Sequence, residues 1–316
     1  MVGWASGPLV VEVHGQQYPV TPSLPRPDVA VAEHLPVTSG WSFTFPEPLG
    51  MEDATRAYSR DGTELVGSPY RGHRKRMQEL QDGLDLAKPG IEFGPLDRPL
   101  LSRKRADVLY VDHASKEDLL AKYRDHPAEN ISPALVRNVD IVWPCGPLAS
   151  RVGGRRFDYA LASHVIEHVP DMIGWLQEVS SVLRPGGVLN LAIPFRDGTF
   201  DRKRHTTPIA SLIANHIEKR TRPTAAQIFD HIAFVAPLGV EEEPHVHAAL
   251  LTARKVEQSN EYLDVHCNVF TPESFVRNIQ LLQDVGLTSF SVRKLFPPDA
   301  PGAYEFIVSL EKTTAT

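Results

Sequence analysis

The spacing of apolar and polar positions along the chain predicts an alternating series of strands and helices. Short runs of apolar and β-branched residues predict strands at residues 90–94, 107–112, 136–143, 157–162 and 188–193. Apolar positions three or four residues apart predict helices at 116–123 and 172–183, and a helix can open at 99–103. Because parallel neighbouring strands need a crossover connection, this alternation predicts a doubly wound, mostly parallel α/β sheet.

The two ends of the chain differ from this central pattern. Runs at 289–296 and 304–310 are close enough to pair as an antiparallel hairpin, which brings the predicted sheet to seven strands. Residues 1–50 hold short β-branched and aromatic runs joined by proline-rich connections, which predicts a small β-rich module. So small a module buries little surface alone, so we expect it to pack on the main domain or on a second subunit of a homo-oligomer.

The predicted organisation has three parts. The β-rich module at 1–50 is followed by a linker and a charged helix at 51–84. An α/β domain at 85–316 follows, with a long insertion at 195–268. A length of 316 residues agrees with roughly two folding units, at about 150 residues per domain.

Composition and charge exclude several classes of protein. Lys and Arg number 33 against 39 Asp and Glu, a net charge of −6, and the longest basic cluster is the short run at 71–76. The sequence therefore predicts no nucleic-acid partner, since phosphate binding needs a concentrated cationic face. Two distant cysteines, Cys145 and Cys267, exclude a disulfide framework and a cysteine-rich zinc site.

Nothing in the hydropathy pattern predicts a membrane protein. No stretch approaches the about 20 continuous apolar residues that a membrane span requires. The amino-terminal residues have no basic region followed by a long apolar region, so no secretory signal is expected. These observations predict a cytoplasmic protein.

A nucleoside site is predicted at the carboxyl ends of the first two central strands. Gly94 follows the first strand, and Asp112 ends the second, 20 residues beyond Glu92. In doubly wound sheets a glycine at this place lets the backbone approach the ligand, and an acid on the next strand binds ribose hydroxyls. The dinucleotide pattern GxGxxG is absent, and Glu92 would repel a pyrophosphate, which favours a ligand without one.

Two segments further along identify a family resemblance. The run FDYALASHVIEHV at 157–169, followed by LRPGGVL at 183–189, resembles the class I S-adenosylmethionine-dependent methyltransferases, and the likeness spans roughly residues 85–200. It implies S-adenosylmethionine as the methyl donor. It further implies a set of donor-binding residues: Glu92, Gly94, Asp112, His113, Ser163 and His164.

The resemblance assigns each of these residues a part of the donor. Glu92 and Gly94 correspond to the family's first motif, and Asp112 to the acid that binds both ribose hydroxyls, with His113 beside the adenine. Ser163 and His164 stand where backbone groups hold the methionine part. Two departures concern adenine: Leu96 and Arg98 replace common glycines, and residues 143–146 lack the usual acid.

The segment after the fourth predicted strand carries candidate chemistry. If it is helical, His164, Glu167 and His168 lie on one face, because they are three and four residues apart. Some relatives bind a divalent metal through an ExxEH segment here, which implies Mg, Mn or Zn held by these three side chains. A histidine acting as a base or substrate contact, or a structural role, are the alternatives.

The insertion at 195–268 concentrates histidines and acids where the family usually builds the acceptor pocket. His266 is the one expected to return to the site, so the candidate catalytic residues are His168, His164 and His266. His205, His245 and His247 are equally well explained as solvated surface.

The acceptor is predicted from weaker signals. The dipeptide Gly3-Trp4 and the runs at 26–30 and 40–43 resemble β modules joined to bacterial glycan-modifying enzymes. This resemblance favours O-methylation of a sugar or polysaccharide hydroxyl. The alternatives are O-methylation of a phenolic or quinone-like small molecule, which an apolar pocket lined by phenylalanines would favour, and a non-catalytic S-adenosylmethionine-binding subunit. The expected partner is thus a small-molecule or glycan acceptor.

Overall fold

The computed structural model describes residues 2–26, 30, 33–43, 55–65, 68, 74–124, 131–236, 243–259, 261–298 and 303–313. The chain divides into two compact units, Met1–Gln78 and Glu79–Thr316. No helix within the described ranges is long and apolar enough to cross a membrane.

The first unit is built from two small antiparallel sheets. β1 (Val2–Trp4) pairs with β4 (Gly40–Ser42), and β2 (Leu9–Val13) lies between β3 (Gln16–Val20) and β5 (Thr55–Ser59). Alternate residues of β2 are buried, as expected for a strand with one solvated face. β5 lies within the segment predicted as a linker, so the β-rich unit extends beyond residue 50.

The second unit holds one seven-stranded sheet, which confirms the predicted fold class. The strand order is β11-β12-β10-β9-β6-β7-β8. Within the described part of this sheet, β12 pairs antiparallel with β10 and β11, and the other neighbouring strands pair in parallel. The strands are β6 (Gly90–Phe93), β7 (Val108–Asp112), β8 (Ile141–Val142), β9 (Phe157–Ser163), β10 (Leu183–Pro194), β11 (Phe290–Phe296) and β12 (Glu305–Lys312). Every residue of β6 is buried, because helices and loops cover both faces of the sheet.

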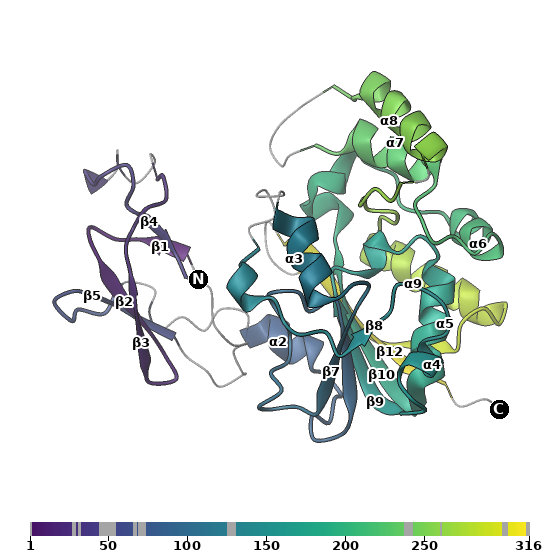
Figure 1. Cartoon of the computed structure of the whole chain (residues 1–316), viewed down its shortest axis with the longest axis horizontal. Coiled ribbons are helices and arrows are strands. Elements are labelled where there is room, and N and C mark those ends of the chain that lie inside the picture. The colour runs from purple at the N-terminus through teal and green to yellow at the C-terminus, as the bar shows by residue number, and fades with distance from the viewer. Residues whose placement is uncertain are drawn as a thin grey trace. The chain divides into compact units, whose positions relative to one another are not determined.

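Helices flank this sheet and extend from it (Figure 1). They are α2 (Arg74–Leu80), which crosses the division between the units, α3 (Lys116–Arg124), α4 (Leu148–Arg151), α5 (Met172–Val182), α6 (Ile209–Ile217), α7 (Ala225–Phe234), α8 (Val246–Ser259) and α9 (Pro272–Asp284). α7 and α8 lie side by side within the predicted insertion. Capping boxes at Thr224 and Thr271 begin α7 and α9.

Three predicted elements differ from the structure. Residues 99–103 form no helix but a bent segment, in which Leu100 and Leu101 donate their backbone N–H groups to the Glu92 carboxylate. The strand predicted at 136–143 is reduced to β8, and the charged helix predicted to begin near residue 70 is described only as α2.

The close approach of β6 to β9 gives one stability test. A Cβ added at Gly90 would lie 2.0 Å from the ring of Tyr159, which is itself buried in the core. We expect Gly90→Ala to lower the free energy of unfolding by about 1–3 kcal/mol through overpacking, measured by urea denaturation. An unchanged midpoint would show that the ring relocates freely.

Candidate active site

The loop after β6 is held by a buried carboxylate. Glu92 accepts hydrogen bonds from the backbone N–H groups of Leu100 (2.6 Å, to Oε1) and Leu101 (3.1 Å, to Oε2). Gly94 lies in the left-handed region (φ +64°), and a Cβ there would come within 2.8 Å of Val165 Cγ2. The loop is thus fixed at both ends, and glycine is needed where it passes the segment after β9.

Asp112 lies at the end of β7, beside the end of β6. The backbone N–H of Gly94 donates to the carbonyl of Val111 (2.9 Å), which joins the two strand ends. Asp112 is buried, and its Oδ1 accepts from the backbone N–H of His113 (2.8 Å) and lies 2.7 Å from His113 Nδ1. The carboxylate is therefore held in one orientation at the place where the sequence predicts ribose binding.

Ser163 ends β9, and the chain bends at the next residue, His164. His164 has φ +54°, and its backbone N–H donates to the carbonyl of Ala192 (3.0 Å). Its Nε2 lies 2.9 Å from Oε2 of Glu305 on β12, and its Nδ1 lies 3.6 Å from Oε1 of Glu167. Glu305 was not predicted as a site residue, because only the sheet order brings β12 near this turn.

The segment after His164 is a short 3₁₀ turn, η3 (Ile166–His168), so the condition for a shared helical face is not met. Asn268 holds this turn: its Nδ2 donates to the carbonyls of Ile166 (3.2 Å) and Val169 (2.8 Å), and its backbone N–H to that of Glu167 (3.0 Å). A single helical face shared by His164, Glu167 and His168 therefore does not form. The last residues of the insertion are docked on the turn.

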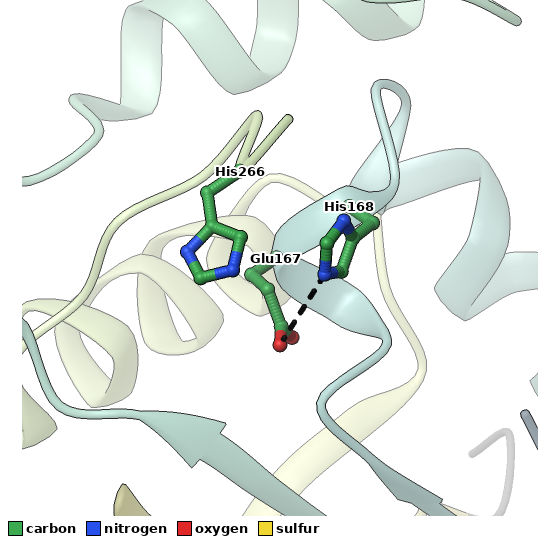
Figure 2. Close-up of side chains that lie close together, drawn as sticks. All are labelled: Glu167, His168 and His266. Atoms are coloured by element: carbon green, nitrogen blue, oxygen red, sulfur yellow. Dashed lines mark ion pairs between the residues drawn. The ribbon is translucent and has the colours of Figure 1, made fainter. Parts of the chain in front are cut away.

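The turn and the insertion together form a cluster of Glu167, His168 and His266. One possible ligand atom from each residue lies within 4.8 Å of the others, and the two rings flank the carboxylate (Figure 2). The structure thus brings His266 to this cluster, whereas His164 is turned toward Glu305. Glu167 is 1% exposed, and neither carboxylate oxygen has a hydrogen-bond partner among the described residues.

His168 is held from the side opposite Glu167. Its Nδ1 lies 2.8 Å from Oδ1 of Asp264, while its Nε2 lies 3.9 Å from Oε1 of Glu167. Lys122 of α3 donates to Oδ2 of Asp264 (2.9 Å). Burial opposes the imidazolium, but the hydrogen bond to Asp264 and the Glu167 charge raise the pKa of His168 above its ordinary value.

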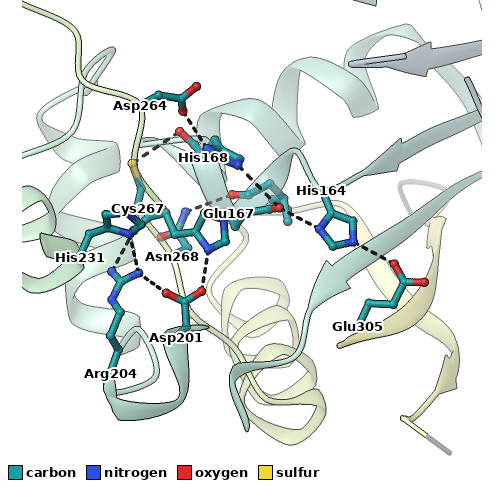
Figure 3. A network of polar contacts seen from close by, with 12 residues as sticks. His164, Glu167, His168, Asp201, Arg204, His231, Asp264, Cys267, Asn268 and Glu305 are labelled. Atoms are coloured by element: carbon teal, nitrogen blue, oxygen red, sulfur yellow. Dashed lines mark hydrogen bonds and ion pairs between the residues drawn. The ribbon is translucent and has the colours of Figure 1, made fainter. Parts of the chain in front are cut away.

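His266 is held by a second aspartate, since its Nδ1 lies 2.6 Å from Oδ2 of Asp201. Arg204 donates to Oδ1 of the same carboxylate (2.7 Å), as Figure 3 shows. Burial opposes ionisation of Asp201, but its contacts with His266 and Arg204 lower its pKa. Burial, then the charges of Arg204 and His266, lower the pKa of His231 to about 4, so that imidazole is neutral.

Other residues that the sequence singled out lie elsewhere. His205, His245 and His247 are exposed. The four phenylalanines whose shared apolar pocket would favour the phenolic alternative are divided. Phe200 contacts the rings of His266 and His231, Phe195 packs on the sheet core, and Phe229 and Phe234 pack together on α7. Phe200 alone of the four contacts the cluster.

The comparisons with known proteins decide the family. Residues 74–291 match the sequence model of the methyltransferase domain, more than half of the chain. The chain belongs to the methyltransferase domain family. The chain thus carries a methyltransferase domain, in agreement with the family resemblance of the motifs at 157–169 and 183–189.

Relatives of this methyltransferase include two named ubiquinone biosynthesis O-methyltransferases. The protein from Cereibacter sphaeroides is 30% identical over 118 residues, 34% of this chain and 40% of its own. The protein from Azorhizobium caulinodans is 26% identical over 183 residues, 54% of this chain and 61% of its own. The methyltransferase thus spans less than two thirds of either relative.

A solved S-adenosylmethionine-dependent methyltransferase from Clostridium acetobutylicum is also similar. It aligns with 76% of this chain and 89% of its own at 10% identity, with a TM-score of 0.40. That likeness is too weak to add to the family assignment.

Proposed function

We propose that this methyltransferase methylates an oxygen of a phenolic small molecule with adjacent hydroxyls, assisted by a divalent cation at Glu167, His168 and His266. The observation that carries the proposal is the Glu167 carboxylate, which is buried, lacks hydrogen bonds among the described residues and is flanked by two imidazoles. A buried carboxylate without hydrogen bonds is costly, and a bound cation would offset that cost.

The possible ligand atoms of the Glu167 cluster fit some cations better than others. Two imidazole nitrogens and one carboxylate oxygen suit Zn²⁺ or Mn²⁺, whereas Mg²⁺ prefers oxygen ligands and retained waters. Each histidine also contacts an aspartate through Nδ1, the arrangement typical of metal-bound imidazoles. Among the three metals expected from the sequence, the site therefore favours Zn²⁺ and Mn²⁺.

The chain's own residues divide the reaction between them. The Asp112 carboxylate accepts hydrogen bonds from the ribose hydroxyls of the methyl donor. The loop ordered by Glu92 leaves room for the methyl donor beside Gly94. The cation, when bound, acts as a Lewis acid that lowers the pKa of an acceptor hydroxyl. The acceptor oxygen then attacks the methyl carbon in line, the carbon–sulfur bond breaks, and S-adenosylhomocysteine leaves, so that positioning supplies most of the rate.

His164 is the imidazole of the three that is left to take the hydroxyl proton. Its Nε2 lies 2.9 Å from the Glu305 carboxylate, within hydrogen-bond distance, whereas its Nδ1 lies 3.6 Å from Glu167. The proton of a neutral His164 is therefore held on Nε2, and the lone pair is on Nδ1. His168 and His266 would use Nε2 for the cation. This assigns His164 as general base and the other two as cation ligands.

The relatives and the aromatic rings favour a phenolic acceptor over a sugar. Both relatives are named for ubiquinone biosynthesis, which supports the phenolic or quinone-like alternative. The rings of His168, His266, His231 and Phe200 lie next to one another, with centroids 4.8–6.1 Å apart in neighbouring pairs, and planar rings of this kind suit a flat acceptor.

Removal of divalent cations tests the proposal. We expect EDTA to reduce the formation of S-adenosylhomocysteine with a catechol at least tenfold, and Zn²⁺ or Mn²⁺ to restore it, since hydroxyl activation needs the cation. Donor affinity, measured by calorimetry in the same EDTA buffer, is the control and should not change. Full activity in EDTA, or turnover of a free hexose but not of the catechol, would refute the cation or the acceptor class.

A further inference from the structure

Each histidine of the Glu167 cluster is paired with one aspartate, and each aspartate with one cationic side chain. On the first side the order is His266, Asp201, Arg204, with contacts of 2.6 and 2.7 Å. On the other side the order is His168, Asp264, Lys122, with contacts of 2.8 and 2.9 Å. The two arrangements share no residue, so they constrain the two rings independently.

The chemistry of these contacts determines where each ring carries its proton. Arg204 donates to Asp201 at 2.7 Å and Lys122 donates to Asp264 at 2.9 Å, so each carboxylate is paired with a cationic side chain that favours its ionised form. An ionised carboxylate only accepts hydrogen bonds. Nδ1 of His266 and of His168 must therefore carry a proton, and a neutral ring then has its lone pair on Nε2.

Arg204 shows that the first pair is built into the interior. Its side chain is 2% exposed, as is that of Asp201. It donates from Nη1 to Asp201 (2.7 Å), from Nη2 to the backbone carbonyl of His266 (2.8 Å) and from Nε to Asp230 (2.7 Å). One guanidinium thus fixes both the His266 backbone and the carboxylate that contacts its ring, and its fork makes it hard to replace by lysine.

We propose that Asp201 and Asp264 are positioning residues that hold His266 and His168 in the tautomer with the proton on Nδ1 and the lone pair on Nε2. Arg204 and Lys122 keep the two carboxylates in place. The role of Nε2 as a cation ligand rests on the proposed function. The position of the proton on Nδ1 rests only on the contacts of His266 with Asp201 and of His168 with Asp264.

The tautomers can be measured in the cation-free protein. Long-range ¹H–¹⁵N correlation spectra at about pH 9, where ordinary imidazoles are neutral, distinguish a proton on Nδ1 from one on Nε2. His168→Gln and His266→Gln assign the two rings. We expect Nδ1–H for both in the wild-type protein. Asp201→Asn should convert His266 alone, and Asp264→Asn His168 alone, to a mixture, because an amide can also donate.

Cation affinity provides the second readout. We expect each of these two asparagine variants to weaken Zn²⁺ binding, titrated by calorimetry, by about 10–100-fold. Asp171→Asn is the matched control, because Asp171 contacts Nδ1 of His216 at 3.1 Å, and His216 is not a member of the Glu167 cluster. It should leave Zn²⁺ affinity unchanged.

The results separate the inference from the proposed function. Nε2–H as the main form of either ring in the wild-type protein, a measurement that needs no folded variant, would overturn the inference. Zn²⁺ affinity that falls equally in Asp171→Asn would do the same. Wild-type protein with Nδ1–H in both rings and no Zn²⁺ binding would uphold the positioning role and refute the proposed cation.

Discussion

Replacing Asp112 by alanine should weaken the binding of S-adenosylmethionine by about 100-fold or more. The carboxylate is buried at the end of β7 and held by His113, so it is oriented before the donor arrives. Each hydrogen bond from a ribose hydroxyl to a charged acceptor contributes about 1.5–3 kcal/mol, and two such bonds therefore account for a loss of this size. Calorimetric titration of the donor measures it directly.

Asp118→Ala is the control for this substitution. Asp118 is an exposed acid on α3, which begins just after β7, and its contacts are with Ser115. We expect donor affinity within about twofold of wild type there, as for most surface substitutions. If Asp112→Ala folds and binds the donor as tightly as wild type, the ribose site does not lie at the end of β7.

Replacing Glu167 by glutamine should abolish cation binding and reduce methyl transfer by about 100-fold or more, since Lewis-acid stabilisation amounts to several kcal/mol. The same variant should be more stable than cation-free wild type. In the wild-type protein the buried Glu167 carboxylate has no hydrogen-bond partner among the described residues, and an unsatisfied charged group costs about 1–3 kcal/mol or more. A gain of about 1 kcal/mol would raise the melting temperature by about 2–4 °C.

Opposite changes in activity and stability are the signature of a side chain kept for function. Glu178→Gln is the matched control, because Glu178 is partly buried on α5 and accepts a hydrogen bond from the backbone N–H of Leu148 (2.7 Å). It should leave cation binding unchanged and lower stability slightly. Lower stability of Glu167→Gln in the cation-free protein would show that the carboxylate is satisfied within the fold.

The order of strands and helices in the α/β unit could be predicted because it rests on local periodicity. Buried parallel strands such as β6 and β9 are apolar along their whole length, and that pattern is visible in the sequence. β8 was overestimated because extended backbone outside a ladder has the same composition as a strand. β5 was missed because a short strand at the edge of a small sheet has a weak pattern.

The site could be predicted only in part, because its geometry depends on contacts far apart in the chain. His266 was singled out by its place in a histidine-rich insertion, 98 residues beyond His168. Glu305 and Lys122 carry no local signal, since only the sheet and the packing of α3 bring them to His164 and Asp264. The turn at 166–168 stays short because Asn268 binds its carbonyls, and no spacing rule reveals that.

The central claim is cation-assisted methyl transfer to a phenolic oxygen. The most direct test is to incubate the full chain with S-adenosylmethionine deuterated in its methyl group and a catechol, with Zn²⁺ or with EDTA, and to analyse the product by mass spectrometry. We expect one labelled methyl group on a catechol oxygen with Zn²⁺, and little product with EDTA or from Glu167→Gln. Equal labelling with EDTA and in Glu167→Gln would contradict the account.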